Sequence, residues 1–149
     1  MNRIVTVLLA LFLLIPVAHS SDPQAPSKSK YLATTAGGFI MRVGDAGAQY
    51  GLTFELRKKI KDPIFATVTF DNPGNPESPM VVEAQIAPGQ KSFTTTSPSF
   101  TVAENGRTYF VNVALYSDVS RSKILGEHRQ GLLFYVDEQL APRVGISLK

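Results

Sequence analysis

The residues of this chain that could catalyse a reaction share one polar stretch, residues 118–130. A serine there, Ser120 or Ser122, could act as a nucleophile. His128 would be its base, and Asp118 would be the carboxylate that orients the base. The stretch has neither a sharp strand-to-helix turn that presents a serine nor a glycine-rich segment that would supply an oxyanion hole. We therefore expect no catalytic residues and predict that the protein is not an enzyme.

The same stretch could hold a metal ion through His128, Asp118 and Glu127. Zinc sites favour several His or Cys ligands, and calcium loops carry closely spaced Asp and Asn residues. The chain has no cysteine and, after its first 20 residues, a single histidine. We therefore expect no metal and no cofactor, and we interpret His128 as a surface histidine that hydrogen-bonds to a neighbour.

Four cations lie within five residues in the run Arg57-Lys58-Lys59-Ile60-Lys61. Such a run could contact an anionic lipid, a glycan or a nucleic acid. It has no interleaved aromatic residue, and Glu55 and Asp62 flank it. The pattern favours a solvated turn between strands. The net charge of the chain is only +3, which argues against a nucleic-acid partner.

Composition limits the classes of protein to which the chain can belong. Its 149 residues predict one domain, because domains are typically about 100 to 150 residues long. The absence of cysteine excludes disulfide scaffolds, Cys-ligated zinc, iron–sulfur clusters and thiol nucleophiles. A chain of this size can bury a core large enough to fold without a metal or a disulfide.

The first 20 residues have the pattern of a cleaved signal peptide. Arg3 precedes an apolar run from Ile4 to Ile15, and small residues precede the expected cleavage point between Ser20 and Ser21. A membrane-spanning helix needs about 20 apolar residues, so the run is too short to be an anchor. We therefore expect an exported protein with no membrane span after cleavage. The lack of cysteine and of Asn-x-Ser/Thr acceptor sites favours a bacterial periplasm, with secretion as the alternative.

The elements that must position these residues are strands. Residues 21–36 are expected to form a flexible polar leader, and residues 37–149 a single domain. Apolar residues alternate with polar ones in seven segments, which is typical of strands with one buried face: 39–43, 50–57, 64–70, 80–87, 91–96, 107–116 and 131–137. Further short strands are expected near Phe100 and Val144. Seven to nine strands separated by turn residues predict an all-β antiparallel sandwich, with a small β-barrel as the alternative.

The segment from Asn105 to Val113 reads Asn-Gly-Arg-Thr-Tyr-Phe-Val-Asn-Val. It resembles the beginning of the sixth strand in immunoglobulin-like and fibronectin type III sandwiches. The resemblance implies that Tyr109 is a corner tyrosine, whose hydroxyl hydrogen-bonds back to the backbone and whose role is structural. It implies an immunoglobulin-like topology for about a hundred residues.

The two strands at 107–116 and 131–137 are apolar on both faces. If Val111 and Val113 point into the core, a second set of residues points outward and forms one aromatic patch: Phe110, Tyr116, Leu133 and Tyr135. Exposed apolar patches of this kind mark partner surfaces. The alternative is that the chain covers the patch itself, with the tail 139–149 or with the segment near Tyr31 and Leu32.

These patterns predict a non-enzymatic, exported module that binds or assembles with a partner protein in the cell envelope or outside the cell. Recognition would use the aromatic sheet face and the adjacent loop 118–130. Interfaces favour Arg and Tyr anchors, so the predicted partner-binding residues are Phe110, Tyr116, Arg121, Lys123, His128, Arg129, Leu133 and Tyr135. The alternative is a protein that binds a carbohydrate or small ligand by stacking it on exposed aromatic rings. A hydrolytic enzyme ranks third.

Overall fold

The computed structural model describes residues 22–44 and 46–149. The expected signal peptide and its cleavage point between Ser20 and Ser21 lie outside the described residues. Within the described residues, nine strands and one short 3-10 helix, η1, follow one another along the chain. Their bounds are β1 (Leu32–Met41), β2 (Ala48–Leu56), β3 (Ile64–Phe70), β4 (Met80–Ile86), β5 (Ser92–Thr96), β6 (Val102–Ala103), β7 (Thr108–Tyr116), β8 (Ile124–Leu133), η1 (Ala141–Val144) and β9 (Ser147–Leu148).

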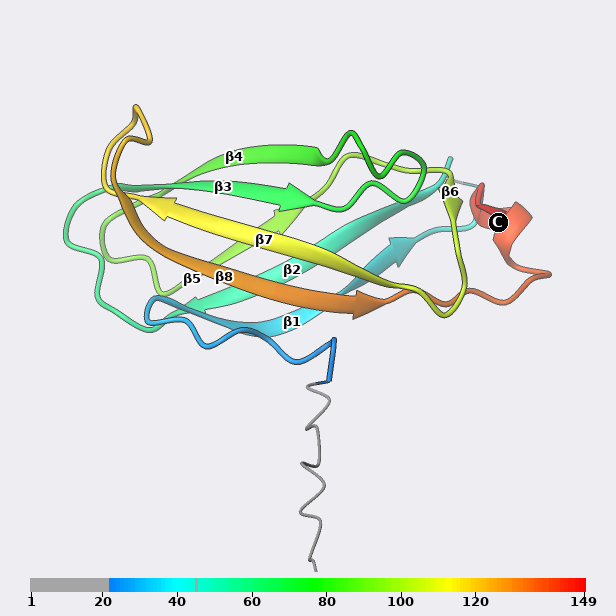
Figure 1. The fold of residues 1–149 in the computed structure, drawn as a ribbon, viewed down its shortest axis with the longest axis horizontal. Helices are drawn as coiled ribbons and strands as arrows, with labels where there is room; N and C mark the ends of the chain where they lie inside the picture. Colours follow the sequence, from blue (N-terminus) through cyan, green and yellow to red (C-terminus); the bar gives the residue numbers. More distant parts are fainter. Residues whose placement is uncertain (1–21, 45) are drawn as a thin grey trace, which may run out of the picture.

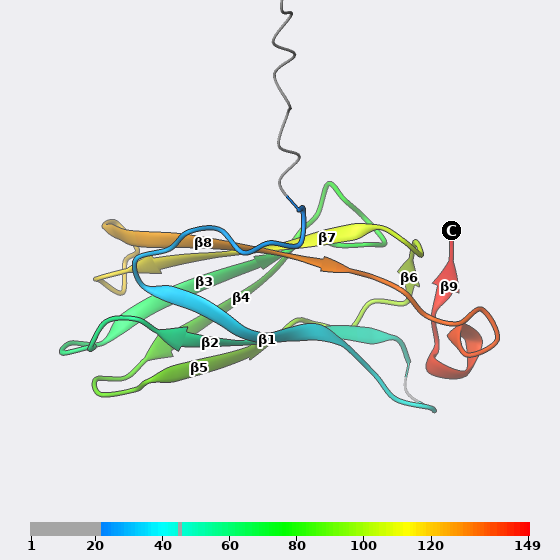
Figure 2. The same ribbon diagram turned by 90° about the horizontal axis from the view of Figure 1, so that it is seen from below.

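The strands form two antiparallel sheets that face each other (Figures 1 and 2). One sheet has the order β1-β2-β5, and the other has the order β4-β3-β7-β8. A short parallel pair, β6 and β9, lies at one end of the molecule (Figure 2). No ladder joins β1 to β8 or β4 to β5 among the described strands. The prediction of an all-β antiparallel sandwich is therefore confirmed, and the barrel alternative is not adopted.

The core lies between the two sheets, where alternate side chains of facing strands meet. The inward set of β7 is Val111, Val113 and Leu115, as its alternation predicts. At one end of the core, the centre of the Phe39 ring lies 4.9 Å from the centres of the Tyr50 and Phe134 rings. Burying a side chain of this size contributes about 1.5–3 kcal/mol. Fully buried large side chains come from both sheets and from the segment after β8: Tyr50, Leu52, Phe54, Phe70, Ile86, Leu115 and Phe134.

Strand β1 begins earlier than the sequence predicts. The expected boundary between the leader and the domain, at residues 36 and 37, falls inside β1. Leu32 is already buried and lies opposite Leu56 of β2. The residues that follow Leu32 are Ala, Thr and Gly, and a bulge between Thr34 and Ala36 shifts the register. These small residues lie on an edge strand with little to bury, so they show no alternation.

Strand β8 also differs from prediction, because it covers Ile124–Leu133 rather than residues 131–137. Its inward positions include the polar residues His128 and Gln130, which hide the alternation in the sequence. Phe134 and Val136 are buried as expected, but they lie beyond the end of the strand. Much of the predicted polar connection 118–130 is thus a strand.

The two short strands expected near Phe100 and Val144 are placed differently. Phe100 forms only an isolated bridge with Ala48. Val144 lies in η1, and Gly145, with a φ of 72°, ends that helix in the left-handed conformation. The short strands that do form are β6 and β9, which pair in parallel.

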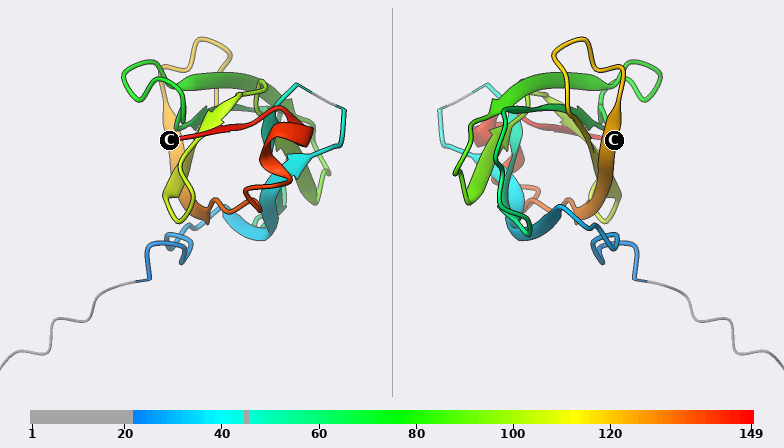
Figure 3. Two further views of the ribbon diagram at one scale, coloured as in Figure 1. Left: turned by 90° about the vertical axis from the view of Figure 1, so that its right-hand side faces the viewer. Right: turned by 90° about the vertical axis from the view of Figure 1, so that its left-hand side faces the viewer.

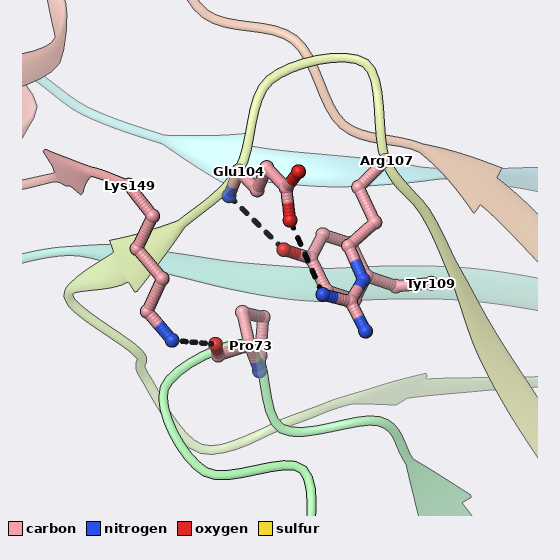
Figure 4. A network of polar contacts seen from close by, with 5 residues as sticks. All are labelled: Pro73, Glu104, Arg107, Tyr109 and Lys149. Carbon is pink, nitrogen blue, oxygen red and sulfur yellow. Dashed lines mark hydrogen bonds and ion pairs between the residues drawn. The ribbon is translucent and has the colours of Figure 1, made fainter.

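Tyr109 is the second residue of β7, next to the turn that leads into this strand (Figure 4). The backbone N–H of Glu104 donates a hydrogen bond to the Tyr109 hydroxyl at 3.0 Å. The Arg107 guanidinium lies over the Tyr109 ring, 5.4 Å from its centre, and pairs with the Glu104 carboxylate at 3.2 Å. Burial raises the pKa of the Tyr109 hydroxyl above its ordinary value. This contact with the backbone five residues upstream is of the kind that the sequence resemblance implies.

Candidate functional site

The outer face of the four-stranded sheet carries rows of side chains set by the strand register. Thr69 of β3, Asn112 of β7 and Arg129 of β8 lie opposite one another. In the next row, Ala114 of β7 lies between Thr67 and Glu127. Asn112, Ala114 and their outward neighbours on β7 are exposed or half-buried, so the predicted outward parity of this strand is confirmed.

These rows form the floor of a groove with a volume of about 670 Å³, which we call the sheet groove. The floor carries hydroxyl and amide groups from Thr67, Thr69 and Asn112, beside the apolar residue Ala114. Tyr116 lines it, together with Glu127, Arg129, Ser27 and Lys28. The sheet groove therefore combines hydrogen-bonding groups, one aromatic ring and charges of both signs.

One side of the sheet groove comes from the N-terminal segment, residues 22–30, which runs along β8 (Figure 2). The Ser27 N–H donates to the Arg129 carbonyl at 2.8 Å, and the Arg129 N–H donates to the Ser27 hydroxyl at 2.7 Å. The Gln130 side-chain amide donates to the Gln24 carbonyl. The N-terminal segment thus occupies hydrogen-bonding groups on the free edge of β8, as edge strands require.

Gly131 permits this contact. A Cβ atom at Gly131 would lie 2.1 Å from the carbonyl oxygen of Pro23, closer than the two atoms can approach. The absence of a side chain at this position lets the N-terminal segment lie directly against β8. The position of the N-terminal segment, which forms the side wall of the sheet groove, thus depends on a glycine at position 131 of β8.

The predicted continuous aromatic patch does not form, and this part of the prediction is wrong. Along β7, the floor residues Asn112 and Ala114 separate Phe110 from Tyr116. Phe110 is half-buried, with the Arg129 guanidinium 3.8 Å from the centre of its ring. Residues Pro23 and Ser27 of the N-terminal segment line the same hollow as Phe110. Phe110 is thus covered by residues that precede the segment near Tyr31, which is one of the two covering segments that the sequence offers as alternatives.

The other two members of the expected patch are exposed but lie elsewhere. Leu133 is 46% exposed at the end of β8, opposite Thr108. Tyr135 is 71% exposed and lies beyond the strand. Neither residue lines the sheet groove. The outer face is therefore polar in its middle and aromatic only toward its ends.

The loop between β7 and β8, residues 117–123, is organised by Asp118. The Asp118 carboxylate accepts hydrogen bonds from the Ser120 hydroxyl, from the hydroxyl and N–H of Ser122, and from the N–H of Lys123. These bonds, led by the one from Ser120, lower the pKa of the Asp118 carboxyl well below its ordinary value. Arg121 adopts a φ of 56° and forms an ion pair with Glu83 of β4 at 3.1 Å.

His128 is buried rather than exposed, so its interpretation as a surface histidine is wrong. It is 3% exposed and shares the inward parity of Gln130. Its Nε2 atom lies 2.7 Å from the Thr34 hydroxyl, and the centre of its ring lies 5.6 Å from the centre of the Phe54 ring. The pKa of the His128 imidazole is lowered mainly by burial and, to a smaller extent, by the positive charge of Arg57.

This placement also separates the residues that could have formed a catalytic triad or a metal site. His128 faces the interior, whereas Asp118, Ser120 and Ser122 bond to one another in the loop. Among the described residues, no group of three or more His, Cys, Asp and Glu side chains is arranged to hold a metal ion. The described chain also contains no helix of the length and apolar character needed to cross a membrane.

Several residues of the sheet groove were not predicted as site residues. Thr67 and Thr69 follow the alternation of β3, but only the pairing of β3 with β7 shows that they lie beside Asn112. Ser27 and Lys28 come from a segment without periodicity, so the sequence gives no signal that it docks on β8. Comparison with known proteins yields no family model that matches the chain, and no curated protein matches it either.

Proposed function

We propose that the protein is a non-enzymatic, exported binding module that recognises a partner protein through the sheet groove. One observation carries the proposal. The side chains of Thr67, Thr69 and Asn112 line the groove, and none of them forms a hydrogen bond with another described residue. Polar groups without partners on a concave surface are available to a ligand. An extended segment of a partner chain would supply both donors and acceptors for them.

The walls of the groove supply anchors of the kind that protein interfaces favour. Tyr116 offers an aromatic ring that is half-buried, and Arg129 a guanidinium held against Phe110. Tyr and Arg are enriched among residues that contribute most to binding. Glu127 and Lys28 place charges of opposite sign on the same groove. A partner with both charge signs would fit this rim best.

The adjacent loop would extend the interface. Lys123 is exposed, and Arg121 is held over the sheet by its ion pair with Glu83. Because Arg121 is already paired, Lys123 is the more available cation of the two. Leu133 and Tyr135 would belong to the interface only if the partner extends past the end of β8.

The strand order also supports the immunoglobulin-like topology as a proposal. The sheet that contains β1, β2 and β5 faces the sheet that contains β3, β7 and β8. The chain thus passes between the two sheets in the same order as in such sandwiches. The Tyr109 contact at the start of β7 supports the same topology. The fold leaves the function open, so the site must carry that argument.

A carbohydrate ligand is the second candidate, and the groove floor favours it. Two hydroxyl groups and one amide group would bind sugar hydroxyls, and the Tyr116 ring would stack on one sugar face. Screening the protein against an array of glycans separates the two candidates. Binding to one glycan class, lost when the groove is filled, would favour the carbohydrate and overturn the protein partner.

The test of the protein partner fills the groove without changing charge. Ala114→Trp places a large ring on the groove floor, and Thr96→Trp places the same ring on the exposed edge of the opposite sheet. A photocrosslinking residue at position 112 should capture a defined partner in the cell envelope. Ala114→Trp should abolish that adduct, and Thr96→Trp should leave it unchanged. Equal adducts in both variants would contradict the proposed site.

A further inference from the structure

The charged residues of the protein are distributed unevenly between the two ends of the sandwich. The loop between β2 and β3 (residues 57–63), the loop between β4 and β5 (residues 87–91) and the loop between β7 and β8 (residues 117–123) lie at the same end (Figure 1). They contain seven of the 14 Lys and Arg residues of the chain after residue 20, but only two of its 12 Asp and Glu residues. We call these three loops the basic end.

The lysines of the basic end are not neutralised by the protein. Lys58 lies over the ring of Tyr31 at 4.5 Å, and Arg57 donates to the Ser29 carbonyl at 3.3 Å. One of the two acids, Asp118, is occupied by hydrogen bonds within its own loop. Five exposed lysines form no ion pair with any described carboxylate: Lys58, Lys59, Lys61, Lys91 and Lys123.

Apolar side chains accompany these cations. Val119, in the loop between β7 and β8, is 70% exposed, and Ile124, the residue after Lys123, is 56% exposed. Between the other two loops lies a pocket of about 330 Å³, whose lining includes Leu56, Ile60 and the stems of the surrounding lysines. No acidic residue lines this pocket. The surface thus presents positive charge and aliphatic groups together.

We propose that the basic end docks on an anionic lipid membrane surface. Clustered lysines are attracted to anionic lipid head groups over about a Debye length, which brings the end of the sandwich to the bilayer. Val119 and Ile124 then enter the interfacial region, and lysine stems lie along the head groups. The inference goes beyond the proposed partner function, because it concerns one end of the sandwich and does not depend on the sheet groove. The two proposed surfaces share only the loop of residues 117–123.

A soluble acidic polysaccharide is the competing occupant. It would satisfy the charges, but it would leave the exposed aliphatic side chains in water. The sequence run from Arg57 to Lys61 alone favours a solvated turn. The fold adds the two other loops and the apolar residues, and this combination favours a lipid surface.

The test measures co-sedimentation of the chain from Ser21 onward with vesicles, since all nine strands lie within that part of the chain. Vesicles of phosphatidylcholine containing one quarter phosphatidylglycerol should bind the protein, and vesicles of phosphatidylcholine alone should not. Binding should weaken as salt is raised. Lys59→Glu with Lys61→Glu should weaken binding at least about tenfold. The matched control, Arg143→Glu with Lys149→Glu, changes the net charge equally at the opposite end and should retain binding.

A second pair of variants tests the apolar contribution. Val119→Asp should weaken vesicle binding more than Val81→Asp, which makes the same change at a residue that is 52% exposed on β4. Equal binding by Lys59→Glu/Lys61→Glu and its control would overturn the proposal. Binding to heparin with no binding to anionic vesicles would overturn it in favour of a polysaccharide. The Ala114→Trp variant should bind vesicles normally, so failure of the groove hypothesis remains distinguishable.

Discussion

A single residue, His128, shows how parity along a strand decides the chemistry of a side chain. The sequence places it in a polar stretch and predicts an exposed imidazole. The register of β8 instead turns it inward, where Thr34 and Phe54 contact its ring. A histidine in this position stays neutral because protonation would place a charge in the core.

The burial of His128 should make stability depend on pH near neutrality. Its pKa in the folded protein lies below the ordinary value of 6.5, so the unfolded chain takes up a proton first as the pH falls. The free energy of unfolding should therefore decrease as the pH falls from 7 through 6.5, and it should level off once the pH passes below the folded-state pKa. Urea unfolding of the chain from Ser21 onward measures this.

His128 is the only histidine after residue 20, so one substitution isolates the effect. His128→Gln keeps a neutral group that can hydrogen-bond to Thr34, and it should flatten the pH dependence over the same range. A wild-type unfolding free energy that does not change between these pH values would contradict the buried, neutral imidazole.

Among the elements, the edge of β8 depends most on a segment that is itself not a strand. The N-terminal segment covers that edge through the paired hydrogen bonds of Ser27 with Arg129. Ser27→Pro removes both the N–H donor and the hydroxyl acceptor. The Arg129 amide should then exchange its hydrogen markedly faster, as measured by NMR.

The control for this prediction is the Val113 amide, which lies in the interior of the same sheet and should keep its slow exchange. If the Arg129 amide is equally protected in Ser27→Pro, the N-terminal segment does not hold the edge of β8. If Ser27→Pro instead unfolds the whole sheet, the Val113 amide should also exchange its hydrogen faster.

The predictability of the elements follows from how much each one buries on one face. Strands β2, β3 and β7 carry an apolar residue at every second position, on the face that lies against the core, and their predicted bounds lie close to the observed ones. Strand β1 is rich in Ala, Thr and Gly, and β8 has polar inward residues, so alternation fails in both. The sheet groove is less predictable still, because its floor depends on which strands pair.

For the whole molecule, one continuous core joins the two sheets. Val113 of β7 is 1% exposed within that core. Val113→Ala should lower the free energy of unfolding by about 1–3 kcal/mol, through lost apolar burial and a small cavity. Denaturant unfolding should retain a single transition with an unchanged slope.

The matched control is Val81→Ala, because Val81 is half-exposed on the outer face of β4 and should change stability by no more than about 0.5 kcal/mol. Equal losses in the two variants would contradict the assignment of inward and outward faces. At this scale the sequence also conceals the charge asymmetry, since the net charge is small and the three basic loops are distant along the chain.

The pairing of β6 with β9 has a practical consequence for how the protein is displayed. The Lys149 N–H donates to the Ala103 carbonyl at 3.0 Å, and the Lys149 ammonium donates to the Pro73 carbonyl at 3.1 Å (Figure 4). This anchors Lys149 at the end of the sandwich opposite the basic end (Figures 1 and 3). An affinity tag fused after Lys149 would therefore orient immobilised molecules with the three basic loops facing the analyte. A tag fused before residue 22 would instead begin at the hollow that Asp22 and Phe110 line.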